Sequence, residues 1–194
     1  WYYRLLPEQP LLCPIGRLDK DTSGLILIAK NKYAAQQLER QRANHTLSRV
    51  YLALAEGHWT NQSKSGLIDR PIEKVPECFN RYQVADTGRP SRTEYEVLSE
   101  FTYEETPFSL VRLKLQTGRT HQIRVHMASL SHPLLGDSIY GHEGFLGFDR
   151  AALHSFEITC QLPGHQDLAV FSSEMPEDFQ KMIAKSINFS STLI

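Results

Sequence analysis

A carboxylate in a polar loop is the first feature of this chain that could do chemistry. Asp19 lies within residues 16–24, which read Gly-Arg-Leu-Asp-Lys-Asp-Thr-Ser-Gly, and an apolar run follows at 25–29. That run predicts a buried strand, which would hold the carboxylate rigidly at the edge of a sheet. A carboxylate held in this way can act as a nucleophile or as a base. The same residue types also build ordinary turns, so the segment alone leaves a purely structural loop open.

The loop also partly matches a calcium-binding loop. Its first, third, fifth and sixth positions carry suitable residues, namely Asp19, Asp21, Ser23 and Gly24. The twelfth position normally holds a glutamate that closes the calcium site, but here it is Lys30. A strand-like run also follows where that motif has a helix. The sequence therefore disfavours calcium.

A second segment predicts a strand, a turn and a helix. Apolar and polar residues alternate over 111–115, as in a half-buried strand. After the turn the apolar residues recur at helical spacing, and we expect a helix over 120–130 with Thr120 as its N-cap. His121 and Arg124 are three residues apart, so they would share one helix face and offer donors to an anion.

Histidines in this segment raise the question of a metal. His121 and His126 are five residues apart, which places them on different helix faces, whereas a helical zinc pair is separated by four. No cysteine pair accompanies them or His132. The spacing therefore disfavours a metal site.

Both segments belong to longer motifs. The first supplies Arg-Leu-Asp at 17–19 and Thr-Ser-Gly-Leu at 22–25, and the second supplies Thr-Gly-Arg-Thr-His-Gln-Ile-Arg-Val-His-Met at 117–127. His-Pro, Gly-Asp and Tyr-Gly pairs follow at 132–133, 136–137 and 140–141, and residues 49–57 form an Arg-x-Tyr-x-Ala strand. In this order the motifs resemble the RluA-type pseudouridine synthases. The resemblance extends from about residue 14 to residue 180.

The resemblance implies an activity and roles for three residues. It makes Asp19 the catalytic aspartate, Tyr51 the ring that packs on the uracil, and Arg124 the basic partner of the aspartate. The reaction detaches uracil from ribose, rotates it and rejoins it through carbon 5, with neither a metal nor an organic cofactor. Whether Asp19 attacks the anomeric carbon or removes the ribose 2′ proton stays open.

RNA contacts are expected around this aspartate. The expected RNA-binding residues are Arg17, Thr22, Arg119, His121 and Gln122. Because the reacting atoms lie in a stacked base, we expect a uridine to be flipped out of structured ribosomal or transfer RNA. Tyr51 would share its strand face with Ala53 and Ala55, whose small side chains leave space for a flat base. Without the resemblance, Tyr51 is equally an ordinary half-buried strand residue.

The chain departs from the family pattern in three places. Gly16 stands where the family commonly has histidine, and Arg49 replaces the usual lysine, which retains the charge but changes its reach. The family also carries an N-terminal strand before the active-site motif, whereas only about 15 residues precede the motif here. We therefore expect residues 1–194 to be a single catalytic domain that is N-terminally incomplete.

Charge favours RNA binding through its distribution. The 21 basic and 22 acidic residues give a net charge of −1, whereas nucleic-acid binders are often strongly basic. Residues 106–136, however, contain four basic and no acidic residues, and residues 17–49 contain seven basic and three acidic ones. A basic groove on a balanced surface is the expected footprint of phosphate contacts. Strand and helix faces that are merely exposed to solvent would give the same distribution of charge.

The whole chain predicts an α+β fold. Its 194 residues, 41% of them hydrophobic, suffice for one core. We expect helices at 33–42 and 176–184, strands at 49–55, 93–97 and 109–117, and loops at 57–66 and 76–90. These strands do not alternate regularly with helices, which favours a largely antiparallel sheet. The resemblance implies the pseudouridine synthase fold, a long mixed sheet flanked by helices with a central active-site cleft.

Composition adds expectations about location and leaves rival functions open. No apolar run approaches the ~20 residues of a membrane span, and three widely spaced cysteines suit a reducing cytosol. We expect a cytoplasmic monomer that does not associate with membranes. The rivals are a catalytically inert RNA-binding domain and a metal-dependent hydrolase that uses Asp19, Asp21 and the histidines. Pure RNA binding has no need of a carboxylate near phosphates, which favours the enzyme.

Overall fold

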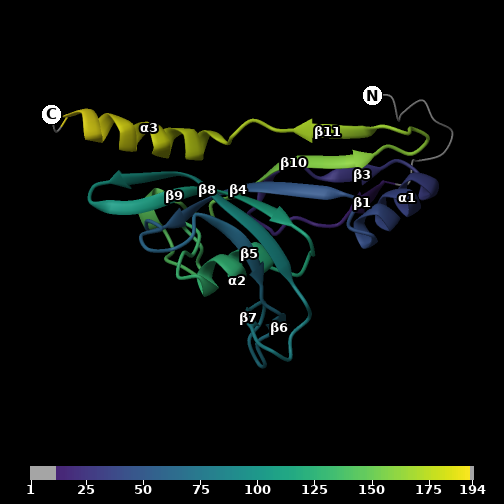
Figure 1. Cartoon of the computed structure of the whole chain (residues 1–194), viewed down its shortest axis with the longest axis horizontal. Coiled ribbons are helices and arrows are strands. Elements are labelled where there is room, and N and C mark those ends of the chain that lie inside the picture. The colour runs from purple at the N-terminus through teal and green to yellow at the C-terminus, as the bar shows by residue number, and fades with distance from the viewer. Residues whose placement is uncertain (1–11, 193–194) are drawn as a thin grey trace.

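A seven-stranded sheet forms the centre of the computed structural model, which describes residues 12–192 (Figure 1). The strands are β1 (Cys13–Ile15), β2 (Ser23–Gly24), β3 (Leu27–Ala29), β4 (Ser48–Glu56), β5 (Ser65–Asp69), β6 (Ile72–Lys74), β7 (Tyr82–Val84), β8 (Arg92–Tyr103), β9 (Thr106–Leu115), β10 (Leu153–Gln161) and β11 (Leu168–Ser172). The helices are α1 (Lys32–Ala43), α2 (Gln122–Ser129) and α3 (Glu177–Thr192), with a 3₁₀ turn at Phe145–Gly147.

The main sheet is mixed and mostly antiparallel, as the sequence predicts. Its strand order is β11-β10-β4-β9-β8-β5, and every pairing along this path is antiparallel. The short strand β2 joins β10 in parallel, outside the path. Two further pairs, β1-β3 and β6-β7, form separate two-stranded sheets. The predicted α+β class is therefore confirmed.

Strand β4 presents different residues to the two faces of this sheet. Tyr51, Ala53 and Ala55 belong to the core cluster that includes residues of α2, whereas Leu52 and Leu54 belong to the cluster that includes residues of α3. Figure 1 shows these two helices on opposite sides of the sheet. Because side chains alternate along a strand, Tyr51 faces the α2 side together with two small neighbours, as predicted.

The apolar run at 25–29 is not the buried strand that we predicted. Only Leu27–Ala29 forms a strand there, and it pairs with β1 alone. Ile26 and Ile28 are 43% and 48% exposed. A two-stranded sheet that packs on one side buries only alternate residues. The continuous apolar run therefore led to the wrong prediction that both faces of this strand are buried.

Two further boundaries differ from the predictions. The expected loop at 76–90 contains β7, which pairs with β6 in a hairpin that projects from the body of the molecule (Figure 1). The last helix continues to Thr192 rather than ending at residue 184. Among the described helices, none combines the length and the apolar character needed to span a membrane.

Candidate active site

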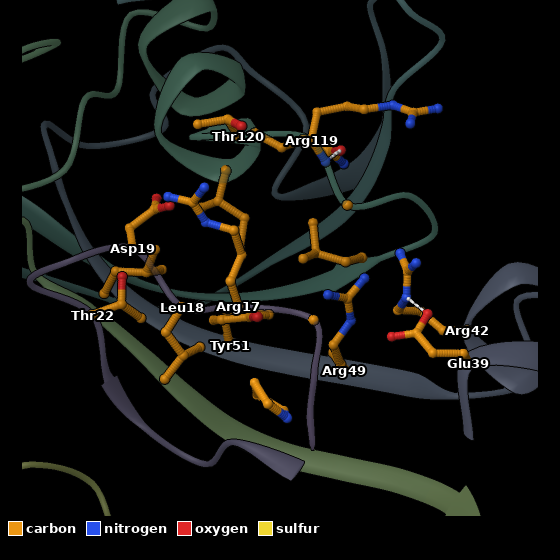
Figure 2. A pocket seen from close by; sticks show the side chains of 17 residues that line it. Arg17, Leu18, Asp19, Thr22, Glu39, Arg42, Arg49, Tyr51, Arg119 and Thr120 are labelled. Carbon is orange, nitrogen blue, oxygen red and sulfur yellow. Dashed lines mark hydrogen bonds and ion pairs between the residues drawn. The ribbon is translucent and has the colours of Figure 1, made fainter. Parts of the chain in front are cut away.

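A cavity of about 420 Å³ lies where the loop after β1 meets β4 and the loop before α2 (Figure 2). Six of the eight predicted site residues line it, namely Arg17, Asp19, Thr22, Tyr51, Arg119 and Gln122. Its wall also includes side chains that sequence reasoning did not assign to the site: Glu39, Arg42, Arg49, Ile123 and Leu153. His121 and Arg124 are not among the lining residues.

The loop that carries Asp19 is fastened to β10. Within the loop, the Thr22 N–H donates to the Asp19 carbonyl at 3.0 Å and closes a turn. The Ser23 hydroxyl lies 2.9 Å from Nδ1 of His154, and β2 pairs with β10 at this point. These contacts hold the backbone of the loop, so the Asp19 side chain is mounted on a rigid support.

Gly24 is required by the close approach of β2 to β10. Its φ is +100°, and a Cβ there would lie 2.2 Å from the Ser155 carbonyl oxygen. That oxygen accepts a hydrogen bond from the Leu25 N–H at 2.9 Å, so it cannot move away without breaking this bond.

We expect Gly24→Ala to lower the free energy of unfolding by about 3 kcal/mol, because strain at positive φ is joined by a backbone clash. Gly147→Ala is the matched control, since its φ is +80° but no atom lies within 4 Å of the added Cβ. It should cost only about 1 kcal/mol. Urea denaturation of both variants separates the two effects, and equal losses would show that the contact with Ser155 is unimportant.

Tyr51 forms part of the cavity wall beside Asp19. The side chain is 5% exposed. Burial raises the pKa of its phenol; the charge of Arg49 opposes this shift, and the Asp19 carboxylate adds to it. The ring therefore stays neutral and offers a flat surface next to the carboxylate. Figure 2 shows that the Arg17 side chain points toward Asp19 across this part of the cavity.

Arg124 makes a buried, two-pronged ion pair with Asp137. Its Nε lies 2.7 Å from Oδ2, and its Nη2 lies 2.6 Å from Oδ1. Burial opposes the charge of Arg124, but the hydrogen bonds and charge of Asp137 outweigh it and raise the pKa of the guanidinium. The charge of Asp19 also acts on Arg124. The directly bonded carboxylate is nevertheless Asp137 and not Asp19, which corrects the predicted pairing.

His121 lies next to this pair and begins α2. It is the N-cap, with φ of 55°, so Thr120 is not the cap that we predicted. Its Nδ1 is 3.0 Å from the Tyr140 hydroxyl. Burial lowers the pKa of His121 and the nearby Asp19 carboxylate partly offsets this, while burial raises the pKa of Tyr140 to about 12. Both groups are therefore neutral near pH 7.

The amide of Gln122 is fully used within the protein. Its Oε1 accepts from the Thr117 hydroxyl at 2.8 Å and from the Arg119 N–H at 3.0 Å. Its Nε2 donates to the Arg92 carbonyl at 2.9 Å and to the Thr93 hydroxyl at 3.0 Å. An amide has two donor hydrogens and two acceptor lone pairs, so none remains for RNA. The prediction that Gln122 binds RNA is replaced by a role in shaping the turn that presents Arg119.

His126 continues this buried network. Nε2 of His126 donates to the Arg70 carbonyl at 2.9 Å, because a carbonyl can only accept. In the neutral imidazole Nδ1 is then the acceptor, and the Thr93 hydroxyl lies 2.9 Å from it as the donor. Burial lowers the pKa of His126 accordingly.

We expect acid to weaken the fold through His126. Its folded pKa lies below the unfolded value of about 6.5, so the unfolded state binds the proton first and stability falls as the pH drops from about 6.5 toward the folded pKa. His126→Gln, which cannot titrate, should reduce this loss. Urea denaturation between about pH 5 and pH 8 measures it, with the exposed His165→Gln as the control. An unchanged pH dependence in His126→Gln would contradict the prediction.

The histidines do not form a metal site in the part of the chain that the structure describes. No group of three or more histidine, cysteine, aspartate or glutamate residues is placed to hold an ion between residues 12 and 192. His132 stacks on Trp59 with ring centroids 4.1 Å apart, and its Nδ1 is bonded to the Glu56 carbonyl at 2.8 Å. The metal-dependent hydrolase therefore gains no support from the geometry.

Comparisons with known proteins identify the family of this chain. The family described as RNA pseudouridylate synthase matches residues 2–129. Ribosomal large subunit pseudouridine synthase D of Nitrosomonas europaea is 37% identical over 186 residues, which cover 92% of this chain and 52% of that protein. An uncharacterized RNA pseudouridine synthase of Bacillus subtilis is 38% identical over 182 residues, which cover 94% of this chain and 59% of that protein.

A solved structure shows the same fold. Human RNA pseudouridylate synthase domain containing 1 matches with a TM-score of 0.71 and 30% sequence identity, over 84% of this chain and 69% of that chain. The chain belongs to the RNA pseudouridylate synthase family. It spans between half and three fifths of the length of the two bacterial relatives.

Proposed function

We propose that this chain is the catalytic domain of an RNA pseudouridine synthase that isomerises uridines in ribosomal RNA. The observation that carries the proposal is the placement of Asp19, in its motif loop, in the wall of a cavity that also holds Tyr51. The relatives from Nitrosomonas europaea and Escherichia coli are named as ribosomal large subunit enzymes, which supports ribosomal RNA as the substrate. Structured transfer RNA is the second substrate class to test.

The cavity suits a uridine that has been turned out of its helix. A volume of about 420 Å³ is large enough for a nucleoside. Tyr51 offers a neutral aromatic face to the uracil, and the Asp19 carboxylate beside it serves as nucleophile or base. Uracil leaves the anomeric carbon through N1, rotates and bonds through carbon 5; carbon 5 loses its proton and N1 gains one.

The remaining site residues divide between contact and support. Arg17, Thr22 and Arg119 line the cavity, and we assign them to RNA contacts. Arg124 and His121 lie beyond the lining, where their bonds to Asp137 and Tyr140 hold the helix that borders it. We assign these two to positioning.

We further propose that residues 1–194 act as one catalytic domain and as a monomer in the cytoplasm. The three cysteines are all free, which agrees with a reducing compartment. A sedimentation measurement tests the monomer, and a concentration-dependent increase in mass would contradict it.

Release of tritium from RNA labelled at uridine carbon 5 tests the activity. We expect release from ribosomal RNA that is unchanged by a chelator, because Asp19 needs no metal for this chemistry. Tight binding without release would instead favour the catalytically inert RNA-binding domain. Release that a chelator abolishes would contradict the cofactor-free mechanism.

A further inference from the structure

The Arg49 side chain lies in the cavity wall without a hydrogen-bonding partner. No hydrogen bond or ion pair engages its guanidinium anywhere in residues 12–192, and its Nε is closed off from solvent. Buried polar groups nearly always have a partner, so an unpaired one calls for an explanation. Arg49 lines the cavity, so its terminal Nη groups, rather than the enclosed Nε, would offer donors to a ligand with acceptor oxygens.

Two nearby arginines, Arg42 and Arg124, differ from Arg49 because each is paired with a carboxylate. Arg42, which also lines the cavity, lies 2.6 Å from the Glu39 carboxylate, and Arg124 is held by Asp137. Their charges are largely balanced within the protein. The charge of Arg49 is not, so it is available to an anion in the cavity.

Two glycines lie beside this guanidinium, and the absence of a side chain at Gly118 leaves room for it. A Cβ on Gly118 would lie 2.8 Å from Nη2 of Arg49, and a Cβ on Gly16 would lie 3.7 Å from Nη1. The φ of Gly118 is outside the left-handed region, so a side chain there would meet no backbone strain but would displace the end of the Arg49 side chain. The guanidinium therefore occupies a slot between the loop that carries Asp19 and the loop that carries Arg119.

The position of Arg49 on β4 directs it into the same cavity as the catalytic groups. It precedes Tyr51 by two residues, so both side chains point to the same face of the sheet. Figure 2 shows Arg49 and Arg42 on one side of the cavity, and Asp19 and Thr22 on the other. A group bound at Arg49 would therefore lie beside, and not on, the atoms that react at Asp19.

We propose that Arg49 binds a phosphate of the RNA backbone next to the nucleotide that enters the cavity. The proposal rests on the proposed function, because that function supplies an RNA strand to this cavity. A guanidinium presents its donors in a planar fork that fits two phosphate oxygens, whereas a lysine offers only a point charge. Arginine at this position thus fixes the direction of the strand as well as attracting it.

The salt dependence of RNA binding tests this contact. Removing one phosphate contact should reduce the slope of log Kd against log salt by about 1. We expect Arg49→Gln to show this reduction and to weaken binding about tenfold at moderate salt. Lys185→Gln is the control, because it removes the same charge from the exposed surface of α3 and should leave the slope unchanged.

Single methylphosphonate linkages in the RNA would identify the phosphate. We expect one position next to the target uridine to weaken wild-type binding about tenfold and to have no further effect on Arg49→Gln. Arg49→Lys keeps the charge, so it should retain the slope but bind less tightly than the wild type. A wild-type slope in Arg49→Gln, or equal losses for both proteins at every position, would overturn the proposal.

These readouts separate the inference from the proposed function. Wild-type protein that binds RNA without releasing tritium would contradict the function, while the slope of Arg49→Gln would still decide the phosphate contact. Active wild-type protein with no change in slope for Arg49→Gln would contradict the contact alone.

Discussion

Asp19→Asn should abolish pseudouridine formation while leaving RNA affinity within about threefold of the wild type. The amide has nearly the same shape as the carboxylate and leaves the backbone bonds of the loop intact, since these involve the Asp19 carbonyl and the Thr22 N–H. It lacks the charge that a nucleophile or a base requires. We expect turnover to fall by about 10⁴-fold or more.

Single-turnover tritium release, with binding measured in parallel, checks this result. Asp21→Asn is the matched control, because Asp21 has the same side chain two residues away, is exposed and does not line the cavity. It should retain activity within about threefold. An active Asp19→Asn protein would remove Asp19 from the mechanism, and loss of activity in both variants would point to a disturbed loop.

The sequence predicted the parts of this site that lie within single contiguous motifs. The loop around Asp19 and the strand that carries Tyr51 are recognisable from residue type and spacing, although contacts with β10 also hold both of them in place. The alternation that puts Tyr51 on the same face as Ala53 and Ala55 follows from strand geometry alone. The face of the sheet on which Tyr51 lies was therefore predicted correctly without the structure.

The errors concern partners that only the tertiary fold selects. The carboxylates of Asp19 and Asp137 both lie near Arg124. The separation of these residues in the chain does not show which carboxylate bonds to the guanidinium, and in the fold it is Asp137. Gln122 was predicted to bind RNA, but its residue type does not reveal that four internal bonds already satisfy it. Arg49 was noted for its charge, and only the fold shows that no carboxylate within residues 12–192 forms an ion pair with it.

Two glycines of the motifs, Gly24 and Gly118, have different structural roles. Gly24 combines a positive φ with a backbone contact, and a sequence pattern of turn residues is typical of such a position. Gly118 has no such backbone requirement and instead leaves space for the Arg49 guanidinium. A glycine that leaves space for a side chain from another strand cannot be interpreted from its local sequence.

Asp137→Asn should cost about 3–5 kcal/mol of unfolding free energy, the largest stability effect that we expect in this protein. Asp137 is fully buried, and its Oδ1 accepts from the N–H groups of Ile139 and Tyr140 as well as from Arg124. Asparagine can keep these backbone bonds through its own oxygen. It removes the charge and puts an NH₂ donor where Oδ2 accepts from Nε of Arg124, so the buried guanidinium loses its counterion and one hydrogen bond.

Asp178→Asn provides the control for this effect of burial. Asp178 pairs with Arg150 at the same distance of 2.6 Å, but the two side chains are 39% and 23% exposed, so water screens the pair and the loss should be only about 0–1 kcal/mol. Urea denaturation of both variants measures the difference. Adding Arg124→Met to Asp137→Asn should then recover part of the stability, because most of the cost lies in the unpaired charge. Equal losses in Asp137→Asn and Asp178→Asn would show instead that solvent reaches Arg124, and its role in holding α2 beside the cavity would have to be reassigned.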